Sequence, residues 1–419
     1  MMAVKTTAIY LFIGSHSLLI GLFPFYLPVF LWKNGILLAG IAAFIAVTGL
    51  GFCVALWGWD RIHKRFAFKW IIAASFVLEG LLLSVIFLGD IQQFLVLLAL
   101  LNGAYNCLFW TTQRVIFLGI IQPGNSGRKF GNLQILAAVL LKTGIFLGGL
   151  LLESFGFGTV FVLSILMAAL SLLTMALKRA LPDTPPELKN QKPISLAKII
   201  RFKDSHHSRP VFMLDGLFLY LESYFWMISL FLVVGEDFWE LGLLVIGLMV
   251  SFTVLFFLIK NSIDRLPSTR FFQISVGLYA VSWLLRGLIT PDLNPIVLGT
   301  GLVLITFFSS LFRLSFAKRF FDIALEGSNY AYLIYKSYLS QASIALLFAL
   351  IAGTLLIAGH APLSFSPVYL LASMIAIGYF IYGKKSHSGV RLKPIDLKHC
   401  SDRHANTYIS GLKTESEKS

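Results

Sequence analysis

Residues 35–65 read GILLAGIAAFIAVTGLGFCVALWGWDRIHKR. The part from 35 to 57 contains no charged side chain, and a basic segment follows it directly. An α-helix rises 1.5 Å per residue, so roughly 20 apolar residues are enough to cross the hydrocarbon of a bilayer. The stretch therefore predicts a membrane-spanning helix that ends at a charged loop.

The whole chain has the composition of a protein dissolved in lipid. Of its 419 residues, 57% are hydrophobic and 13% are charged, whereas a soluble domain carries about 25% charged residues. This excludes a water-soluble globular enzyme, a disordered chain and a secreted disulfide scaffold. The sequence contains no Walker loop, no GxSxG elbow and no HExxH motif, so we expect no catalytic residues and no cofactor.

Counting apolar runs between polar breaks predicts an all-α membrane protein with twelve transmembrane helices. The run from 8 to 31 is longer than the core of a secretory signal, which is roughly 7–15 residues, so we interpret it as a retained helix. The predicted spans are approximately 8–31, 35–57, 68–89, 92–114, 131–153, 157–177, 210–234, 241–260, 271–289, 294–316, 329–358 and 366–383.

Basic residues alternate between the predicted loops. The net charge is +14, from 34 Lys+Arg and 20 Asp+Glu, and most of the positive charge falls in every second loop and in the tail. By the positive-inside rule, this pattern places the N- and C-termini in the cytoplasm. It also explains the basic composition without a nucleic-acid partner. We expect a multi-pass protein of the plasma membrane, specifically a bacterial inner membrane.

The sequence contains an internal repeat. Asp60-Arg61 recurs as Asp264-Arg265, 204 positions later, and Leu108-Phe109 recurs as Leu311-Phe312 at an offset of 203. Gly124 and Gly327 share the offset of 203. One spacing at three places predicts two pseudo-symmetric six-helix halves, residues 1–177 and 210–383, a plan known from transporters.

Two polar segments flank the second half. The linker 178–209 contains ISLAKIIRF at 194–202, which fits either a short amphipathic helix on the membrane surface or a solvated linker. The tail 384–419 is predicted to be disordered. Its His399, Cys400 and His404 are too few for a metal site, so we expect no metal.

The loop after the second predicted helix resembles the signature of the major facilitator superfamily, approximately G-x-x-x-D-R-x-x-[RK]-[RK]. Leu56 stands in place of the glycine in this pattern. His63 stands in place of a second glycine of the family, at a position written as x above, while the charged positions match. The resemblance covers about residues 5–385 and implies two bundles that open alternately to each side. It further implies a cytoplasmic gate formed by Asp60, Arg61, Lys64, Arg65, Asp264 and Arg265.

The fifth predicted helix contains the small-residue run Gly144-Ile145-Phe146-Leu147-Gly148-Gly149. It resembles the end of the antiporter signature of that family, with Ile145 in place of a proline. Small residues also allow two helices to approach closely in lipid. Ordinary helix packing is therefore the favoured interpretation.

The fourth predicted helix has a polar face. Asn102, Asn106 and Gln113 lie within about 40° of one another at 100° per residue. Tyr105 and Trp110 flank them. The family resemblance implies that helices one, four, seven and ten line a central cavity. We therefore predict a substrate cavity formed by this face together with Tyr220, Tyr224 and Trp226 of the seventh helix.

Several ionisable residues fall at membrane depth, where they are expensive unless paired or hydrated. Glu222 is predicted to be an isolated carboxyl near the midplane, a candidate for proton coupling because desolvation disfavours its charged form. Asp215 is predicted near the cytoplasmic end of its helix and hydrated. Arg114 and Arg313, near the cytoplasmic ends of the fourth and tenth helices, are predicted to be interfacial anchors or gate contacts. The remaining candidates for proton coupling or charge pairs are Lys142, His16, Lys336 and Glu79.

Together these features predict a secondary active transporter of a small organic solute, monomeric in the bilayer, with coupling to protons as a hypothesis. The degenerate loop signature and the missing proline motivate an alternative. In that alternative, the chain is a transporter-like sensor, scaffold or assembly partner that moves no solute.

Overall fold

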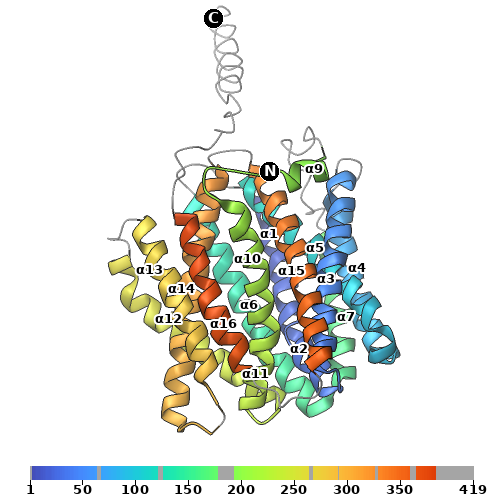
Figure 1. Cartoon of the computed structure of the whole chain (residues 1–419). Coiled ribbons are helices and arrows are strands. Elements are labelled where there is room, and N and C mark those ends of the chain that lie inside the picture. Colours follow the sequence, from blue (N-terminus) through green and yellow to red (C-terminus); the bar gives the residue numbers. More distant parts are fainter. Residues whose placement is uncertain are drawn as a thin grey trace, which may run out of the picture.

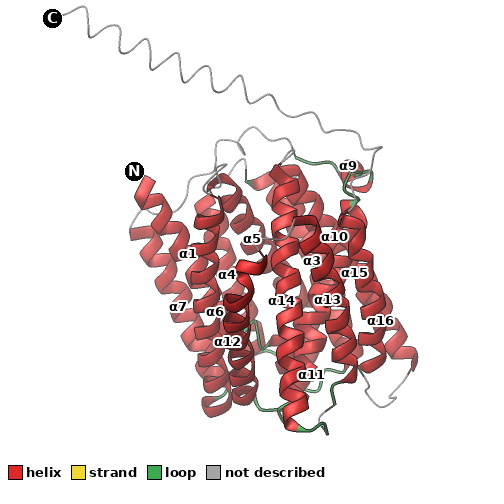
Figure 2. Ribbon diagram, turned by 90° about the vertical axis from the view of Figure 1, so that its left-hand side faces the viewer, coloured by secondary structure: helices red, strands yellow, loops and turns green. Residues whose placement is uncertain are grey.

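The computed structural model describes residues 2–63, 68–120, 126–177, 193–263, 268–290, 292–325, 329–358 and 365–383. Within these ranges every regular element is a helix. The helices run side by side in one bundle (Figures 1 and 2). The all-helical class predicted from the sequence is thus confirmed.

The helices of the first half of the chain follow the predicted apolar runs, with ends that differ by up to about six residues. One predicted span, 8–31, is broken in two near Pro24 and Pro28, because proline lacks the N–H that a helix interior needs. The elements are α1 (Met2–Leu22), α2 (Leu27–Lys33), α3 (Leu38–Ile62), α4 (Phe68–Leu88), α5 (Ile91–Ile120), α6 (Ser126–Phe155) and α7 (Phe157–Leu177).

The second half contains a local irregularity that the apolar pattern did not predict. A π-helical turn, η1, interrupts the predicted span 210–234, and such turns are frequent at functional sites. The elements are α9 (Leu196–Ile200), α10 (Ser208–Tyr220), η1 (Leu221–Phe225), α11 (Trp226–Val233), α12 (Phe238–Ile263), α13 (Ser268–Leu288), α14 (Pro295–Leu325), α15 (Asn329–Ala358), α16 (Ser366–Ala376) and η2 (Ile377–Gly383).

Ten helices or helix runs in the described residues are long and apolar enough to cross a membrane. The run Ser366–Tyr382 is a shorter apolar helix. The number of twelve crossings is therefore not established by length and hydropathy, and it stays a prediction.

Helix α9 lies at the end of the bundle where α1 begins, which we call the α9 end (Figures 1 and 2). Ile199 and Phe202 are buried, and the Phe202 ring stacks on Tyr335 of α15 at 4.5 Å. This part of the linker is thus helical and packed on the bundle, while Leu196 and Ile200 stay exposed. Residues 178–192 and the tail 384–419 lie outside the described residues.

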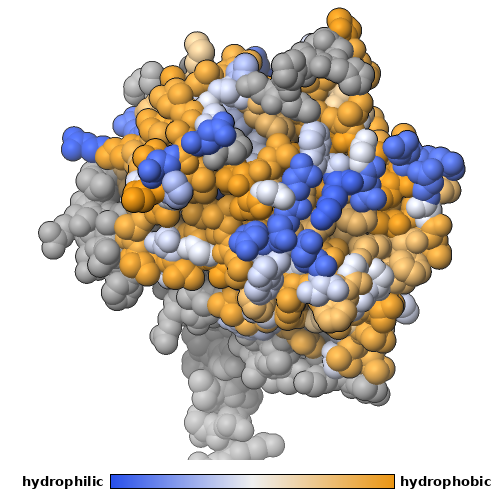
Figure 3. Space-filling model, turned by 90° about the horizontal axis from the view of Figure 1, so that it is seen from below, coloured by the Kyte–Doolittle hydropathy of each residue, from blue (hydrophilic) through white to orange (hydrophobic). Residues whose placement is uncertain are grey.

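The opposite end of the bundle is seen in Figure 3, where hydrophilic side chains gather over part of the face among hydrophobic ones. Here Lys33 lies 3.8 Å from the carboxylate of Glu153. Its ammonium also lies over the Phe238 ring, 4.6 Å from the centroid. These contacts join α2, α6 and α12.

Helices α1 and α6 pack with their backbones in close contact. A Cβ added at Gly144 would lie 2.2 Å from the carbonyl oxygen of Leu18, and one at Gly148 would lie 2.2 Å from that of Leu22. No side chain fits there without moving the backbone, so the glycine run of α6 has a packing role. Between the two halves of the sequence, α3 packs against α15 and α6 against α12.

Replacing Gly144 with alanine should lower the free energy of unfolding by about 1–3 kcal/mol, the usual cost of overpacking, because the new methyl group meets backbone. Gly353→Ala in α15 is the matched control, since nothing lies within 4 Å of its Cβ position. Thermal unfolding of both variants in detergent would measure the difference. Equal stability of the two would show that α1 and α6 are not in this close contact.

Candidate functional site

A cavity of about 680 Å³ lies between the two halves of the chain. Its wall comes from the α1–α2 break and from α3, α5, α10, η1, α11, α14 and α15. Seven of the residues predicted from the sequence line it: Asn102, Tyr105, Asn106, Trp110, Tyr220, Tyr224 and Lys336. Two predicted lining residues do not, namely Gln113 and Trp226.

A chain of side-chain hydrogen bonds follows the polar face of α5. Trp110 Nε1 donates to Asn106 Oδ1 at 3.1 Å, and Asn106 Nδ2 donates to Asn102 Oδ1 at 3.0 Å. Asn102 Nδ2 in turn donates to the Tyr224 hydroxyl at 3.3 Å. The i, i+4 spacing places these groups one above another on the helix, and the last bond reaches from the first half of the chain to η1 in the second.

A charged cluster borders the cavity on the side of the second half. Arg313 donates to Asp215 Oδ1 at 2.6 Å and, through Nε and Nη2, to Glu222 Oε2 at 3.0 and 2.8 Å. Lys336 Nζ lies 2.8 Å from the other Asp215 oxygen. Asp215 and Glu222 are seven residues apart, so two turns of helix place both carboxylates on the side facing α14.

Three expectations from the sequence are corrected by this cluster. Glu222 is not isolated, because Arg313 contacts it and Arg286 lies 3.6 Å away. Asp215 is not at a hydrated position but is 4% exposed. Arg313 is not an interfacial anchor. Sequence spacing could not reveal the pairings of Arg313, because its two partners are 91 and 98 residues away in the chain.

Behind the cluster, Arg286 is held within the second half. It is 4% exposed and donates to the hydroxyls of Ser282 and Ser309 at 3.0 and 2.9 Å. Its guanidinium lies over the rings of Trp283 and Trp226, 4.3 and 5.1 Å from their centroids. Trp226 thus supports a buried cation instead of lining the cavity.

Arg114 of α5 lines the cavity without a local partner. Among the described residues it makes no hydrogen bond and no ion pair, and the attraction of Asp215 acts on it at longer range. Four cations, counting Arg286, therefore face two carboxylates in and around the cavity. The excess positive charge suits a ligand with an anionic group.

His16 and Glu79 meet inside the first half, and neither lines the cavity. His16 Nδ1 lies 3.5 Å from Glu79 Oε2, with both side chains almost fully buried. The imidazole also contacts the Ser75 hydroxyl at 3.0 Å and stacks on Phe76 at 3.9 Å. These contacts join α1 to α4. Lys142 joins neither this pair nor the charged cluster, and it lies in a different pocket.

At the α9 end, Asp60 connects three segments. Its Oδ1 accepts a hydrogen bond from the Tyr330 hydroxyl at 2.5 Å, and its Oδ2 accepts one from the backbone N–H of Ile194 at 2.7 Å. Asp60 thereby joins α3 to α15 and to the linker. Arg61 is not part of this contact, because its guanidinium covers the Trp57 ring at 3.9 Å.

Four residues of the predicted gate lie outside the described residues: Lys64, Arg65, Asp264 and Arg265. The sequence analysis did not select Tyr330, and it assigned Arg114 to an interfacial or gate position and not to the cavity. The only sequence signal for either was the position of a polar side chain at the end of an apolar run. That signal is shared by many interfacial residues.

Comparison with known proteins identifies the family. The model of the Major Facilitator Superfamily matches residues 9–324, so the chain belongs to this superfamily. Among curated proteins none matches the sequence.

Solved structures of transporters share the fold at low sequence identity. The nucleoside transporter NupG has a TM-score of 0.65 at 15% identity, covering 90% of this chain and 98% of its own. A point mutant of NupG gives 0.64 at 16%, covering 91% and 100%. A POT family transporter in complex with a thioalcohol-conjugated peptide gives 0.59 at 14%, covering 91% and 94%. These likenesses show the fold, while the superfamily match and the long apolar helices make the chain a multi-pass integral membrane protein of a transporter superfamily.

Replacing Tyr330 with phenylalanine should lower the free energy of unfolding by about 1–3 kcal/mol, because it leaves a buried carboxylate oxygen of Asp60 without its donor. Tyr335→Phe is the matched control in the same helix, since its hydroxyl makes no hydrogen bond among the described residues. Thermal unfolding in detergent compares the two. If Tyr335→Phe costs as much as Tyr330→Phe, the contact with Asp60 contributes nothing.

Proposed function

We propose that the protein is a secondary active transporter that carries a small organic solute by alternating access. Two six-helix halves, residues 1–177 and 210–383, would rock about the central cavity and open it to each side in turn. The observation that carries the proposal is a cavity whose wall comes from both halves and contains a cation, Arg114, without a partner among the described residues.

The size of the cavity supports a small organic solute. Its volume of about 680 Å³ falls within the roughly 300–1,000 Å³ of small-molecule sites. The hydrogen bond between Asn102 and Tyr224 connects the halves at the cavity wall. A solute that replaces this bond would therefore affect how the halves hold together.

The chemistry of the wall supports a solute with a ring and an anionic group. The rings of Tyr220 and Tyr224 stack at 5.3 Å, and Trp110 presents a third aromatic surface. Aromatic side chains offer flat apolar faces for ring stacking. Arg114 offers the charge-assisted hydrogen bonds that a carboxylate or phosphate accepts.

The topology that we propose has twelve crossings with the α9 end in the cytoplasm of a bacterium and the protein monomeric in the inner membrane. The basic loops support this orientation through the positive-inside rule. Asp60 and Tyr330 would then form a cytoplasmic closure, opened when α3 and α15 separate. Transport would require this hydrogen bond to break and form again in each cycle.

Coupling to protons is a further part of the proposal. Glu222 shares Arg313 with Asp215, so protonation of Glu222 would leave the guanidinium bound to Asp215 alone. A change of partner at Arg313 would alter the charge presented to the cavity. It would also change the contacts between η1 and α14 that position the wall.

Arg114→Met should weaken the transport of an anionic ring compound while leaving that of its neutral analogue unchanged. Nicotinate and nicotinamide are suitable probes, because they have the same ring and nearly equal size. We expect a rise of about tenfold or more in the concentration of nicotinate needed for half-maximal exchange in proteoliposomes, since a hydrogen bond to a charged group contributes roughly 1.5–3 kcal/mol. An equal effect on both probes would contradict the anion site.

Glu222→Gln should abolish accumulation driven by a pH gradient and preserve exchange of solute without a gradient. Glutamine still accepts a hydrogen bond from Arg313, but it cannot take up a proton. The exposed Glu240→Gln is the control. If the Glu222 variant accumulates solute as the unmodified protein does, Glu222 is not the coupling group.

The same proteoliposomes separate transport from the sensor or scaffold alternative. A folded protein that binds solutes in the cavity and moves none under any gradient would favour that alternative. Flux that is independent of every driving ion would indicate a uniporter.

A further inference from the structure

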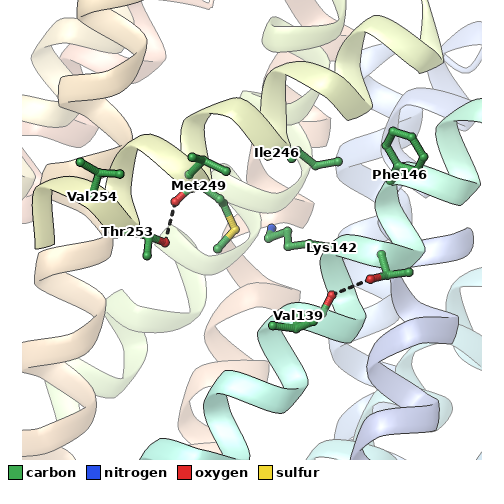
Figure 4. Close-up of a pocket in the computed structure, with 9 residues that line it drawn as sticks. Val139, Lys142, Phe146, Ile246, Met249, Thr253 and Val254 are labelled. Atoms are coloured by element: carbon green, nitrogen blue, oxygen red, sulfur yellow. Dashed lines mark hydrogen bonds between the residues drawn. The ribbon is translucent and has the colours of Figure 1, made fainter. Parts of the chain in front are cut away.

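A second cavity, of about 580 Å³, lies between α6 and α12. Figure 4 shows Lys142 of α6 extending toward Met249 of α12 in this space. None of its lining residues lines the central cavity. The lining consists of Val139, Lys142, Thr143, Phe146, Ile246, Met249, Val250, Thr253 and Val254.

This pocket opens to the outside of the bundle. Val139, Val250 and Val254 at its edge are 57%, 59% and 55% exposed. The face of α6 that carries Gly144 and Gly148 packs on α1, so the face that carries Val139 and Lys142 is directed away from the core of the first half. In a membrane, the surroundings of such a pocket are lipid chains.

Lys142 is the only charged residue in the lining. Among the described residues it has no hydrogen bond and no ion pair. Helix α6 begins at Ser126 and ends at Phe155. At 1.5 Å per residue, Lys142 lies about 24 Å along the helix from its first residue and about 20 Å from its last. At this depth its ammonium cannot extend to the headgroup region, as lysines near helix ends do.

An unpaired cation in an apolar pocket is stabilised most by an anion that arrives with an apolar body. If the anion is a carboxylate, it would pair with Lys142, and the hydrocarbon chain of the ligand would cover the valine, methionine and phenylalanine side chains of the pocket. The phosphate of a bilayer phospholipid stays roughly 15 Å from the midplane, half the thickness of the hydrocarbon. A single-chain carboxylate has no such anchor and fits the depth of Lys142.

We propose that the α6–α12 pocket binds the carboxylate of a long-chain amphiphile that enters sideways from the bilayer, with Lys142 as its counter-ion. The site is separate from the solute cavity and does not depend on the transport activity proposed above. Because α6 and α12 belong to different halves of the sequence, the occupant contacts both halves at once.

Binding of a nitroxide-labelled stearate to the full chain in nanodiscs of neutral phospholipid tests the proposal. Electron paramagnetic resonance measures the immobilised fraction of the label. We expect Lys142→Met to weaken binding by about tenfold, consistent with the loss of one charge-assisted hydrogen bond, and Lys142→Arg to retain it. Lys69→Met is the control, because Lys69 is exposed at the α9 end.

Folding of the variants can be checked independently. Lys142→Met removes an unpaired charge from an apolar setting, so its thermal stability without amphiphile should equal or exceed that of the unmodified protein. Added stearate should raise the melting temperature of the unmodified protein and not that of Lys142→Met. A loss of folding in Lys142→Met would leave Lys142→Gln and Lys142→Arg as the pair to compare.

Three results would overturn the proposal. One is equal immobilisation of the label in Lys142→Met and the unmodified protein, and another is equal binding of the matching long-chain alcohol, which has no charge. The third is displacement of the labelled stearate by nicotinate, which would place Lys142 in the solute pathway. Failure of nicotinate exchange in proteoliposomes would bear on the transport proposal alone, since the stearate measurement involves no transport.

Discussion

The structure depends on one constraint: each charged side chain within the membrane needs a partner, because lipid cannot solvate it. Removing a charged group from water costs several kcal/mol unless a partner replaces the water. Arg313 meets this constraint by contacting two carboxylates, and Arg286 meets it with two serine hydroxyls and two tryptophan rings. These contacts connect α10, η1, α13 and α14. The charged cluster therefore holds four elements of the second half together in addition to its apolar core.

The two halves of the chain differ in how many charged side chains they bury and in how these are paired. The offset of 203 found in the sequence aligns Arg313 with Trp110. The first half contributes neutral asparagines and one cation, Arg114, from α5, whereas the second half contributes Asp215, Arg313 and Lys336 to the wall. Its buried acid Glu79 is paired with His16 within the half. Both carboxylates and three of the four cations in and around the cavity therefore belong to the second half. Aromatic side chains come from both halves, Trp110 from the first and Tyr220 and Tyr224 from the second, so a solute would contact charged and aromatic groups together.

Two cations, Arg114 and Lys142, have no hydrogen-bond or ion-pair partner among the described residues. Each lines a cavity, and the two cavities share no residue. One cavity lies between the halves, and the other faces the bundle exterior. An unpaired charge in such a medium is costly, and an anionic ligand at each cavity would complete it.

The sequence by itself determined the medium, the helical class, the positions of the helices and the family. In lipid, a single apolar run that crosses the bilayer satisfies its backbone hydrogen bonds by forming a helix. The polar face of α5 followed from the helical spacing of its polar residues. Only the tertiary structure decided which charges meet. Glu222 and Arg313, or Asp60 and Tyr330, are brought together by helix packing across 91 and 270 residues. Periodicity describes one helix at a time, whereas the partner of a buried charge depends on which face of another helix lies opposite.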